Sequence, residues 1–556
     1  MVRWLDPHQL LDTAARVVLS GTFSSYADSR ELQAFVAVEV ADRSGPPEMW
    51  LDYVADLGDG WNSTYTVARL LATEGLKLDW NGRAVPTERG SILVMGGDQV
   101  YPVPNRTEYE NRLLGPYRSA LPCARGESPE LFAIPGSHDW YDGLINFTSV
   151  FCRSRSIGGW RTRQTRSYFA LKLPHGWWLW GIDLQFGSHL DEAQLQYFSD
   201  VAVDGLAEGD RVILCMAKEV DSGRDDTEIY SDRDLAYLER EVIEPNGAFV
   251  AVYLKSGRHH YCRYEEEGGA RHVITAGGGG AFLHPTHQLP ERIDPPGVGE
   301  AGSYQRAATY PTTDVSKRLR KRTWLLPLYN LPLAGVFAGV HVLLAFMLGL
   351  HLGDRHRALG FSGLRLALWE SPTAFLLVLL MIITFGAMVR FAHDANGVSR
   401  VLLGLVHSSL QCATLAGVML GASRLASALG LGGAPSLLVF LAFVGLLGGA
   451  ASTVGVAGYL WATNCLGLHG NEAYAPLHHM DLKNFLRLHI DREGTLTLYP
   501  VGIDRVGRRW KLCPDAPAHA PWFAPAGADA TPRLIEAPIR ITRDGSSDER
   551  SRDSGR

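Results

Sequence analysis

The sequence predicts an α/β (α+β) domain, followed by a four-helix transmembrane region and a short β-hairpin segment. Between residues 50 and 290, apolar runs recur that end in polar, glycine-bearing loops. Residues 324–463 contain almost no acidic side chains, and two alternating segments follow them. Because 556 residues exceed what one hydrophobic core usually serves, we expect more than one structural unit.

The N-terminal stretch "MVRWLDPHQLLDTAARVVLSG" has the apolar spacing of an amphipathic helix. It lacks the uninterrupted apolar core and the small-residue cleavage site of a signal peptide, so we expect that the domain after it is not exported. Residues 1–49 are therefore predicted to be a helical extension, residues 50–315 the α/β domain, and residues 316–330 a basic linker.

Four stretches approach the roughly 20 apolar residues that a membrane-spanning helix needs. They are Leu331–Leu352, Thr373–Met388, Val401–Gly421 and Ser436–Thr463. The cluster "KRLRKR" precedes the first stretch, and basic clusters of this kind stay on the cytoplasmic side. We expect a multi-pass protein of the cell (inner or plasma) membrane, with the lipid bilayer as a partner and both large ends in the cytoplasm.

The run "GLLGGAASTVGVAG" in the last stretch favours close helix packing, which would also let the helices of two copies associate. After it, residues 464–514 include two alternating segments around a glycine-containing loop, which indicates a β-hairpin that docks on the α/β domain. Residues 515–556 are predicted to be disordered. Within 464–514, His469, Asn471 and Glu472 form a polar cluster with no assigned role.

Charge and cysteine usage exclude some classes of protein. The net charge is -6, without a basic block large enough for a binding face, so we expect no nucleic-acid partner. The seven cysteines are scattered and never form a C-x-x-C pair, which predicts neither a disulfide framework nor a zinc knuckle.

Candidate functional residues follow four predicted strands. The segments are "WLDYVADLGDGWNSTY", "SILVMGGDQVYP", "LFAIPGSHDWYDG" and "AVYLKSGRHHYCRY". Strands that release carboxylates and imidazoles at one edge of a sheet are a common way to assemble a site from distant parts of a chain.

In this order, the motifs resemble those of the calcineurin-like metallophosphoesterase family, over roughly residues 50–285. The matching residues are Asp56, Gly97-Asp98, Gly136-x-His138-Asp139 and the region Ser256–His260. The chain looks most similar to a membrane-linked bacterial branch in which "DYVADLGDG", "GGDQVYP" and "HDWYDG" stand nearly as they do here. The resemblance implies a calcineurin-like two-sheet β-sandwich flanked by helices, with two divalent metal ions at the strand ends.

The resemblance also implies roles for individual residues. Asp98 would bridge the metals, and Asp56 would bind one of them. Asp59 would replace the family's His, Ser137 would stand at the position of its Asn, and His259 or His260 would supply an imidazole suited to Mn, Fe or Zn. A metal-bound water would attack phosphorus. His138, with Asp139 fixing its tautomer, would stabilise the phosphorane charge or protonate the leaving oxygen.

Several positions depart from the family pattern. Ser137 replaces a metal-binding Asn, Gly58 replaces a His, and Gly257 stands where the related branch has an Asp. The strand "RVILCMAKEV" supplies no imidazole.

Two hypotheses follow. In the first, the chain is a membrane-anchored, metal-dependent phosphoesterase (a hydrolase) that cleaves a phosphomonoester or phosphodiester of a small molecule or lipid at a cytoplasmic site. In the second, it is a degenerate metallophosphoesterase, a pseudoenzyme that binds a phosphorylated ligand or acts as a scaffold. Its substrate-binding charges would come from Lys218, Lys255 and Arg258.

Overall fold

The structure is a computed structural model, and the chain divides into two compact units. The sheet unit comprises residues 1–2, 12–316 and 479–556, and the helical unit comprises residues 3–11 and 317–478. The described residues are 1–23, 39–184, 190–218, 233–268, 271–293, 304–352, 374–430, 432–527 and 529–542.

Two large β-sheets build the sheet unit. In spatial order, the first contains β1 (Val40–Asp42), β9 (Phe169–Lys172), β10 (Trp177–Ile182), β11 (Arg211–Met216), β12 (Phe249–Lys255), β14 (His272–Ala276), β13 (Tyr261–Glu266), β16 (Tyr304–Tyr310) and β15 (Arg292–Ile293). The second contains β4 (Arg83–Glu88), β3 (Gly75–Trp80), β21 (Pro532–Leu534), β18 (Leu496–Ile503), β17 (Lys483–Ile490), β2 (Met49–Val54), β5 (Ile92–Met95), β6 (Glu130–Ala133), β8 (Trp160–Thr162) and β7 (Ser156–Ile157), and β22 (Ile539–Ile541) pairs with β18.

Helices and short strands complete this unit. The described helical segments of its middle part are α3 (Trp61–Ala72), α4 (Arg106–Tyr109), η1 (Glu110–Leu114), α5 (Gly115–Ala120), η2 (Asp139–Asp142), α6 (Ile145–Phe151), η3 (Pro174–Gly176), α7 (Glu192–Gly205), η4 (Leu238–Ile243) and η5 (Glu244–Asn246). The strands β19 (Trp510–Leu512) and β20 (Phe523–Pro525) form a separate pair.

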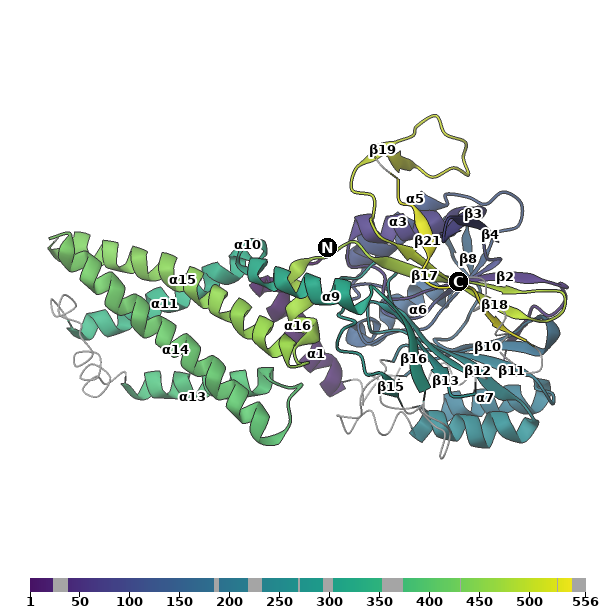
Figure 1. Ribbon diagram of the computed structural model, residues 1–556, viewed down its shortest axis with the longest axis horizontal. Coiled ribbons are helices and arrows are strands. Elements are labelled where there is room, and N and C mark those ends of the chain that lie inside the picture. Colours follow the sequence, from purple (N-terminus) through teal and green to yellow (C-terminus); the bar gives the residue numbers. More distant parts are fainter. Residues whose placement is uncertain are drawn as a thin grey trace. The chain divides into compact units, whose positions relative to one another are not determined.

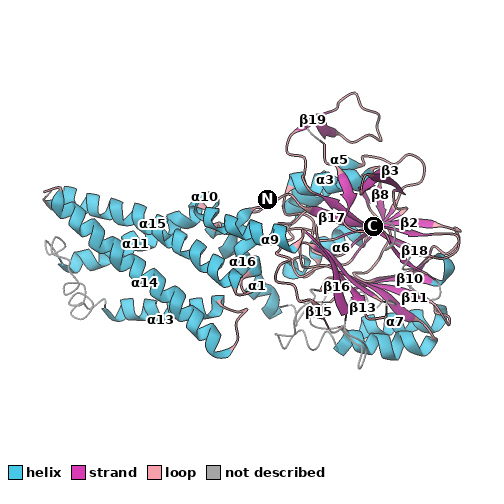
Figure 2. Cartoon of the chain, in the orientation of Figure 1, coloured by secondary structure: helices cyan, strands magenta, loops and turns pink. Residues whose placement is uncertain are grey.

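The sheet unit consists of sheets and outer helices (Figures 1 and 2), and three apolar cores lie between these layers. The core between the sheets joins Leu51 and Leu486 of the second sheet to Ile213 of the first. Two further cores pack α3 and α5 on the second sheet, and α7 and η4 on the first. Two facing sheets with helices outside them are how a domain buries both faces of each sheet. The predicted two-sheet sandwich flanked by helices is therefore present in the described residues.

The four segments predicted to end in functional loops are confirmed as strands β2, β5, β6 and β12. In the second sheet, β2, β5 and β6 pair in parallel, and in the first sheet β12 pairs in parallel with β11. Parallel neighbours end at the same edge of their sheet, so each sheet brings its loops together.

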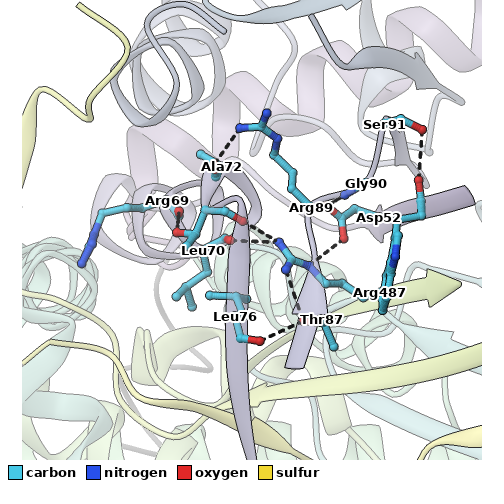
Figure 3. Close-up of polar contacts among 12 residues, drawn as sticks. Asp52, Arg69, Leu70, Ala72, Leu76, Thr87, Arg89, Gly90, Ser91 and Arg487 are labelled. Carbon is cyan, nitrogen blue, oxygen red and sulfur yellow. Dashed lines mark hydrogen bonds and ion pairs between the residues drawn. The ribbon is translucent and has the colours of Figure 1, made fainter. Parts of the chain in front are cut away.

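The predicted C-terminal hairpin is β17 and β18, and its partner strand is β2. Figure 3 shows the buried polar contacts that accompany this pairing. Arg487 on β17 is fully buried, and its Nε donates to Asp52 Oδ1 on β2 at 3.0 Å. The same guanidinium donates to the carbonyl oxygens of Leu70 and Thr73 at the end of α3. The hairpin thus lies inside the second sheet.

Three expectations about chain organisation need correction. The disordered tail does not begin at residue 515, because β21 and β22 pair with β18, and residues 543–556 lie outside the described residues. The N-terminal extension includes the helix α1 (Pro7–Phe23), but β1 already belongs to the first sheet. The basic linker is helical, in α9 (Thr313–Arg320), η6 (Lys321–Leu325) and α10 (Leu326–Tyr329).

The helical unit contains α11 (Leu331–Leu352), α13 (Ala374–Phe391), α14 (Gly397–Ala428), α15 (Gly433–Cys465), α16 (Gly470–Tyr474) and η8 (Ala475–Leu477). Among the described residues, two helices, α14 and α15, are long and apolar enough to cross a membrane. A third span would require that Thr313–Tyr329 and Leu331–Phe346, which meet at a 58° bend, count as one. The prediction of four membrane-spanning helices is therefore not confirmed. The helix α13, which covers the second predicted span, has 18 residues and contains Arg390.

The glycines of α15 allow a close approach to α11, as their sequence indicated. A Cβ on Gly449 would lie 2.6 Å from the carbonyl oxygen of Ala334, and one on Gly448 would lie 2.6 Å from the ring of His341. Backbone contact of this kind is typical of helix pairs that pack through small residues.

Candidate functional site

Three candidate ligands meet at one hydroxyl group. Tyr101 Oη lies 3.2 Å from Asp56 Oδ1, 3.1 Å from Asp98 Oδ2 and 2.9 Å from His259 Nε2. The loops after β2, β5 and β12 supply these three side chains, so both sheets contribute to the site. All four side chains are at most 5% exposed.

The site is rich in acceptor atoms. His259 Nδ1 lies 2.8 Å from the carbonyl oxygen of Phe282, which can only accept, so Nδ1 carries the hydrogen and Nε2 offers a lone pair. Burial, together with the stacked ring of His284, lowers the pKa of His259 well below its ordinary value. Burial also raises the pKa of Tyr101 well above 10, so the phenol stays neutral. One hydroxyl hydrogen thus faces three acceptors.

Two carboxylates and one imidazole are the ligand types that Mn, Fe and Zn accept, so the donor set fits a divalent cation in kind. Among the described residues, however, Asp56, Asp98 and His259 do not form a group whose ligand atoms all lie within 4.8 Å of one another. The Tyr101 hydroxyl lies among these atoms. A cation would therefore compete with the hydroxyl for the same three acceptors.

Both aspartates have a backbone conformation that non-glycine residues rarely adopt. The φ angle is 56° at Asp56 and 49° at Asp98. Such residues cost on the order of 1–3 kcal/mol each and cluster at functional sites. Gly136 allows the close approach to Asp98, because a Cβ there would lie 2.2 Å from Asp98 Oδ1. Strain at both carboxylates is independent support for a functional site at these strand ends.

Gly257 occupies the position where the related branch would have an aspartate, and it contributes its backbone instead. Its N–H lies 3.2 Å and 3.0 Å from the two carboxylate oxygens of Asp56. With φ at 88°, this residue is in the left-handed region that favours glycine. The loop therefore orients Asp56 without adding a side-chain ligand.

His138 lies beside the site, but Asp139 does not fix its tautomer as predicted. The backbone N–H of His138 donates to Asp98 Oδ1 at 2.9 Å. The centroid of the His138 ring lies 4.5 Å from that of the Tyr101 ring. His138 Nδ1 lies 2.8 Å from the carbonyl oxygen of Pro102, which sets the tautomer.

The Asp139 carboxylate turns into the fold instead. It accepts hydrogen bonds from the backbone N–H groups of Gly136 and Gln99 and from the hydroxyl of Tyr109. Burial and the nearby Asp98 raise the pKa of Asp139 to about 8. These contacts hold the loop of residues 136–139 in place.

The other predicted metal ligands do not join this group. Asp59 accepts hydrogen bonds from the backbone N–H groups of Val2 and Phe282, one on each oxygen, which is a structural arrangement. Ser137 is half-buried, and its carbonyl oxygen accepts the Trp140 N–H. His260 is buried, and burial lowers its pKa to about 3.

Of the predicted substrate-binding residues, Lys255 ends β12, and Lys218 follows β11, its parallel neighbour. Both lysines are buried, with exposed fractions of 2% and 7%. Arg258 is half-buried in the loop that also carries Gly257 and His259. All three cations lie at or just after the carboxyl ends of β11 and β12 in the first sheet.

Sequence reasoning missed three residues of this region. Tyr101 was part of the quoted motif "GGDQVYP", but no role was given to it. Lys483 and Asn484 begin β17 and are fully buried, and among the described residues their side-chain nitrogen and oxygen atoms have no hydrogen-bond partner. Lys483 lies within electrostatic range of His259 and Asp59, and burial lowers its pKa to about 8. No local pattern indicated this placement, because Lys483 and Asn484 lie more than 200 residues after His259 in the sequence.

No family model matches the sequence. No curated protein matches it either. Among solved structures, the chain is weakly similar to GAP50, the anchor in the inner membrane complex of Plasmodium (13% identity, 47% of this chain and 80% of that one, TM-score 0.31).

Two further structures are similar at the same level. One is purple acid phosphatase PPD1 from yellow lupin (Lupinus luteus) seeds, at 10% identity, covering 48% of this chain and 49% of that one, with a TM-score of 0.30. The other is PhoD, at 11% identity, covering 49% and 70%, with a TM-score of 0.29. TM-scores of this size carry no argument about the activity of this chain.

Proposed function

We propose that the chain is a membrane-anchored phosphoesterase with a reduced metal site. The observation that carries this proposal is the convergence of Asp56, Asp98 and His259 on the single hydroxyl hydrogen of Tyr101. These three side chains, two carboxylates and one imidazole, would hold a divalent cation. When bound, a divalent cation polarises a phosphoryl oxygen and lowers the pKa of a bound water.

The surrounding charges suit a phosphorylated substrate. Lys218, Lys255 and Arg258 follow strands of the first sheet, and Lys483 adds a buried ammonium from the second. Positive groups in a water-poor site stabilise the negative charge that develops on a phosphoryl group. His138 would exchange a proton through Nε2, because its Nδ1 is engaged by Pro102.

Membrane anchoring is proposed from the helical unit and from the path of the chain. The helical unit interrupts the sheet unit, yet β17, after that unit, pairs with β2, before it. The chain must therefore cross a bilayer an even number of times. The helices α14 and α15 supply two crossings, and α11 and α13 would supply the other two of the four predicted. The basic residues of α9 and η6 favour a cytoplasmic sheet unit, near lipid-linked substrates.

A second candidate function is binding of a phosphorylated ligand without turnover, as a signalling or scaffolding protein. The position of the Tyr101 hydroxyl among the three candidate ligands favours it, because a hydrogen bond there takes the place of a metal bond. Ser137 and Gly257, where stronger ligands were expected, favour it as well.

The two functions differ in turnover. Full-length protein in detergent would be assayed with a chromogenic phosphomonoester and a chromogenic phosphodiester, with Mn²⁺ and with chelator. We expect Mn²⁺-dependent turnover that Asp98→Asn lowers by at least about a hundredfold. Asp142→Asn is the matched control, since this carboxylate bonds only to the N-terminal end of α6 among the described residues. Absence of turnover with any metal would reject the phosphoesterase and leave the binding protein.

A further inference from the structure

A second group of metal-binding side chains lies within the helical unit. His393 and Asp394 belong to the connection between α13 and α14, and His469 and Glu472 belong to the turn after α15 and to α16. Among the described residues, His393, Asp394 and Glu472 have ligand atoms that all lie within 4.8 Å of one another. We propose that these three residues form a structural site for a zinc-class cation, with His469 beside it.

The distances fit a shared cation better than direct hydrogen bonds. His393 Nε2 lies 3.2 Å from Asp394 Oδ1 and 3.6 Å from Glu472 Oε1, and His469 Nδ1 lies 3.6 Å from Glu472 Oε2. Zinc bonds of about 2.0–2.1 Å in a tetrahedron place neighbouring ligand atoms about 3.3–3.4 Å apart. The two separations within the group, 3.2 and 3.6 Å, bracket that value, and the longer one exceeds hydrogen-bond length.

Two atoms at or beside the group have no hydrogen-bond partner among the described residues. His469 is fully buried, yet its Nδ1 has no hydrogen-bond partner there, and neither has Glu472 Oε2. Burying such groups without a partner costs free energy. A cation bound by the Glu472 carboxylate would satisfy Oε2.

Surrounding contacts fix the orientation of the group. The Tyr459 hydroxyl lies 3.3 Å from His469 Nε2, which leaves Nδ1 directed at Glu472, and the ring of Phe391 stacks on His469 at 4.8 Å. The backbone N–H of His469 donates to Asp394 Oδ2 at 2.6 Å. The other carboxylate oxygen of Asp394, Oδ1, faces His393. Partners of this kind orient the ligands of known metal sites.

The site would join two separate connections of the helical unit. One links α13 to α14, and the other follows α15, where the chain leaves the helical unit. A cation held by both would clamp the ends of three helices, and its binding energy would add to the stability of the helical unit. This role is independent of the phosphoesterase proposal.

The test measures zinc on full-length protein in detergent that carries Asp98→Asn, so that metal at the first site does not interfere. We expect about one equivalent of zinc after dialysis, and an affinity that falls about tenfold or more in Glu472→Gln and in His393→Ala. These two residues are not fully buried, so both variants should fold. His519→Ala, a half-buried histidine of the sheet unit, is the control and should retain the zinc.

A second measurement reports the coordination geometry of the bound metal ion. Cobalt substituted for zinc should give the intense visible absorption of a tetrahedral ion, and this absorption should disappear in Glu472→Gln. Zinc-free Asp98→Asn protein, or zinc affinity unchanged in both variants, would overturn the proposal. An adduct with the weak absorption of octahedral cobalt would also overturn the tetrahedral arrangement.

Discussion

At the scale of single residues, the most informative side chain is Tyr101, which lies in a quoted motif but was given no role from the sequence. Its hydroxyl lies within 3.2 Å of two carboxylates and one imidazole, while Asp139, which was expected to support His138, bonds elsewhere. The chemistry of the site depends on whether a cation displaces this hydroxyl from its acceptors.

Replacing Tyr101 with Phe tests that competition. The variant removes one hydrogen bond but keeps the ring, and a net hydrogen bond is worth about 1 kcal/mol. We expect Mn²⁺ affinity, measured by isothermal titration calorimetry, to rise about five- to tenfold. Unchanged or weaker binding would show that the hydroxyl does not compete with the cation.

Lys483 predicts a pH dependence of stability. Its folded pKa of about 8 lies below the ordinary 10.5, so between these values the unfolded chain binds more protons and stability rises with pH. Below about pH 8, the folded protein carries the full cost of a buried ammonium. We therefore expect Lys483→Met to raise the free energy of unfolding by about 1–3 kcal/mol at pH 7, and by less as the pH approaches 10.

The measurement is urea unfolding of the sheet unit, followed by tryptophan fluorescence at both pH values. Lys511→Met, at an exposed position of β19, is the matched control and should change stability little at either pH. A stabilisation that does not vary with pH would contradict the assigned cause.

At the scale of elements, the hairpin of β17 and β18 links the C-terminal segment to the second sheet and to the site region. Alternation along β17 directs Leu486 and Leu488 to the core between the sheets, whereas Phe485 packs against the helices. Arg487 faces the helix side as well and ties the hairpin to Asp52 (Figure 3). The same hairpin brings Lys483 and Asn484 to the site region.

Asp52→Asn should destabilise the sheet unit by about 3–5 kcal/mol, because it leaves the buried guanidinium of Arg487 without its counter-charge. Chemical unfolding would measure the loss. Asp79→Asn, at an exposed position of β3, should change stability by less than about 0.5 kcal/mol. If Asp52→Asn behaved like this control, the ion pair would not hold the hairpin.

At the scale of the whole molecule, the sheet unit is built from both ends of the chain. Between β3 and β2, the order of strands is β21, β18 and β17, so the C-terminal segment fills the middle of the second sheet. Both ends of the helical unit must consequently lie on the same side of any membrane it crosses. This constraint excludes three spans and allows two or four.

Cysteine labelling in intact cells would test the orientation, in a background where the seven native cysteines are replaced by serine. With a cytoplasmic sheet unit, an impermeant thiol reagent should label Leu429→Cys, between α14 and α15, but not Leu512→Cys in the sheet unit. Both positions are more than half exposed. The opposite labelling pattern would place the sheet unit outside.

The sequence by itself determined the kinds of element and their order. Apolar runs followed by glycine-bearing loops predicted β2, β5, β6 and β12, and alternation predicted the hairpin, because the type of an element depends on local patterning. The candidates Asp56, Asp98 and His259 came from the same segments. The prediction of disorder from residue 515 onward was wrong for the described residues. Short strands such as β21 and β22 are stabilised by pairing with a neighbouring strand and not by their own composition.

Only the tertiary structure decided which side chains meet. Tyr101 faces residues of both sheets, Lys483 reaches the site from more than 200 residues away, and His393 meets Glu472 across two helices. Such contacts depend on strand register, strand order and helix packing, which no local pattern specifies. Local patterning therefore determines the elements, and long-range packing determines the sites.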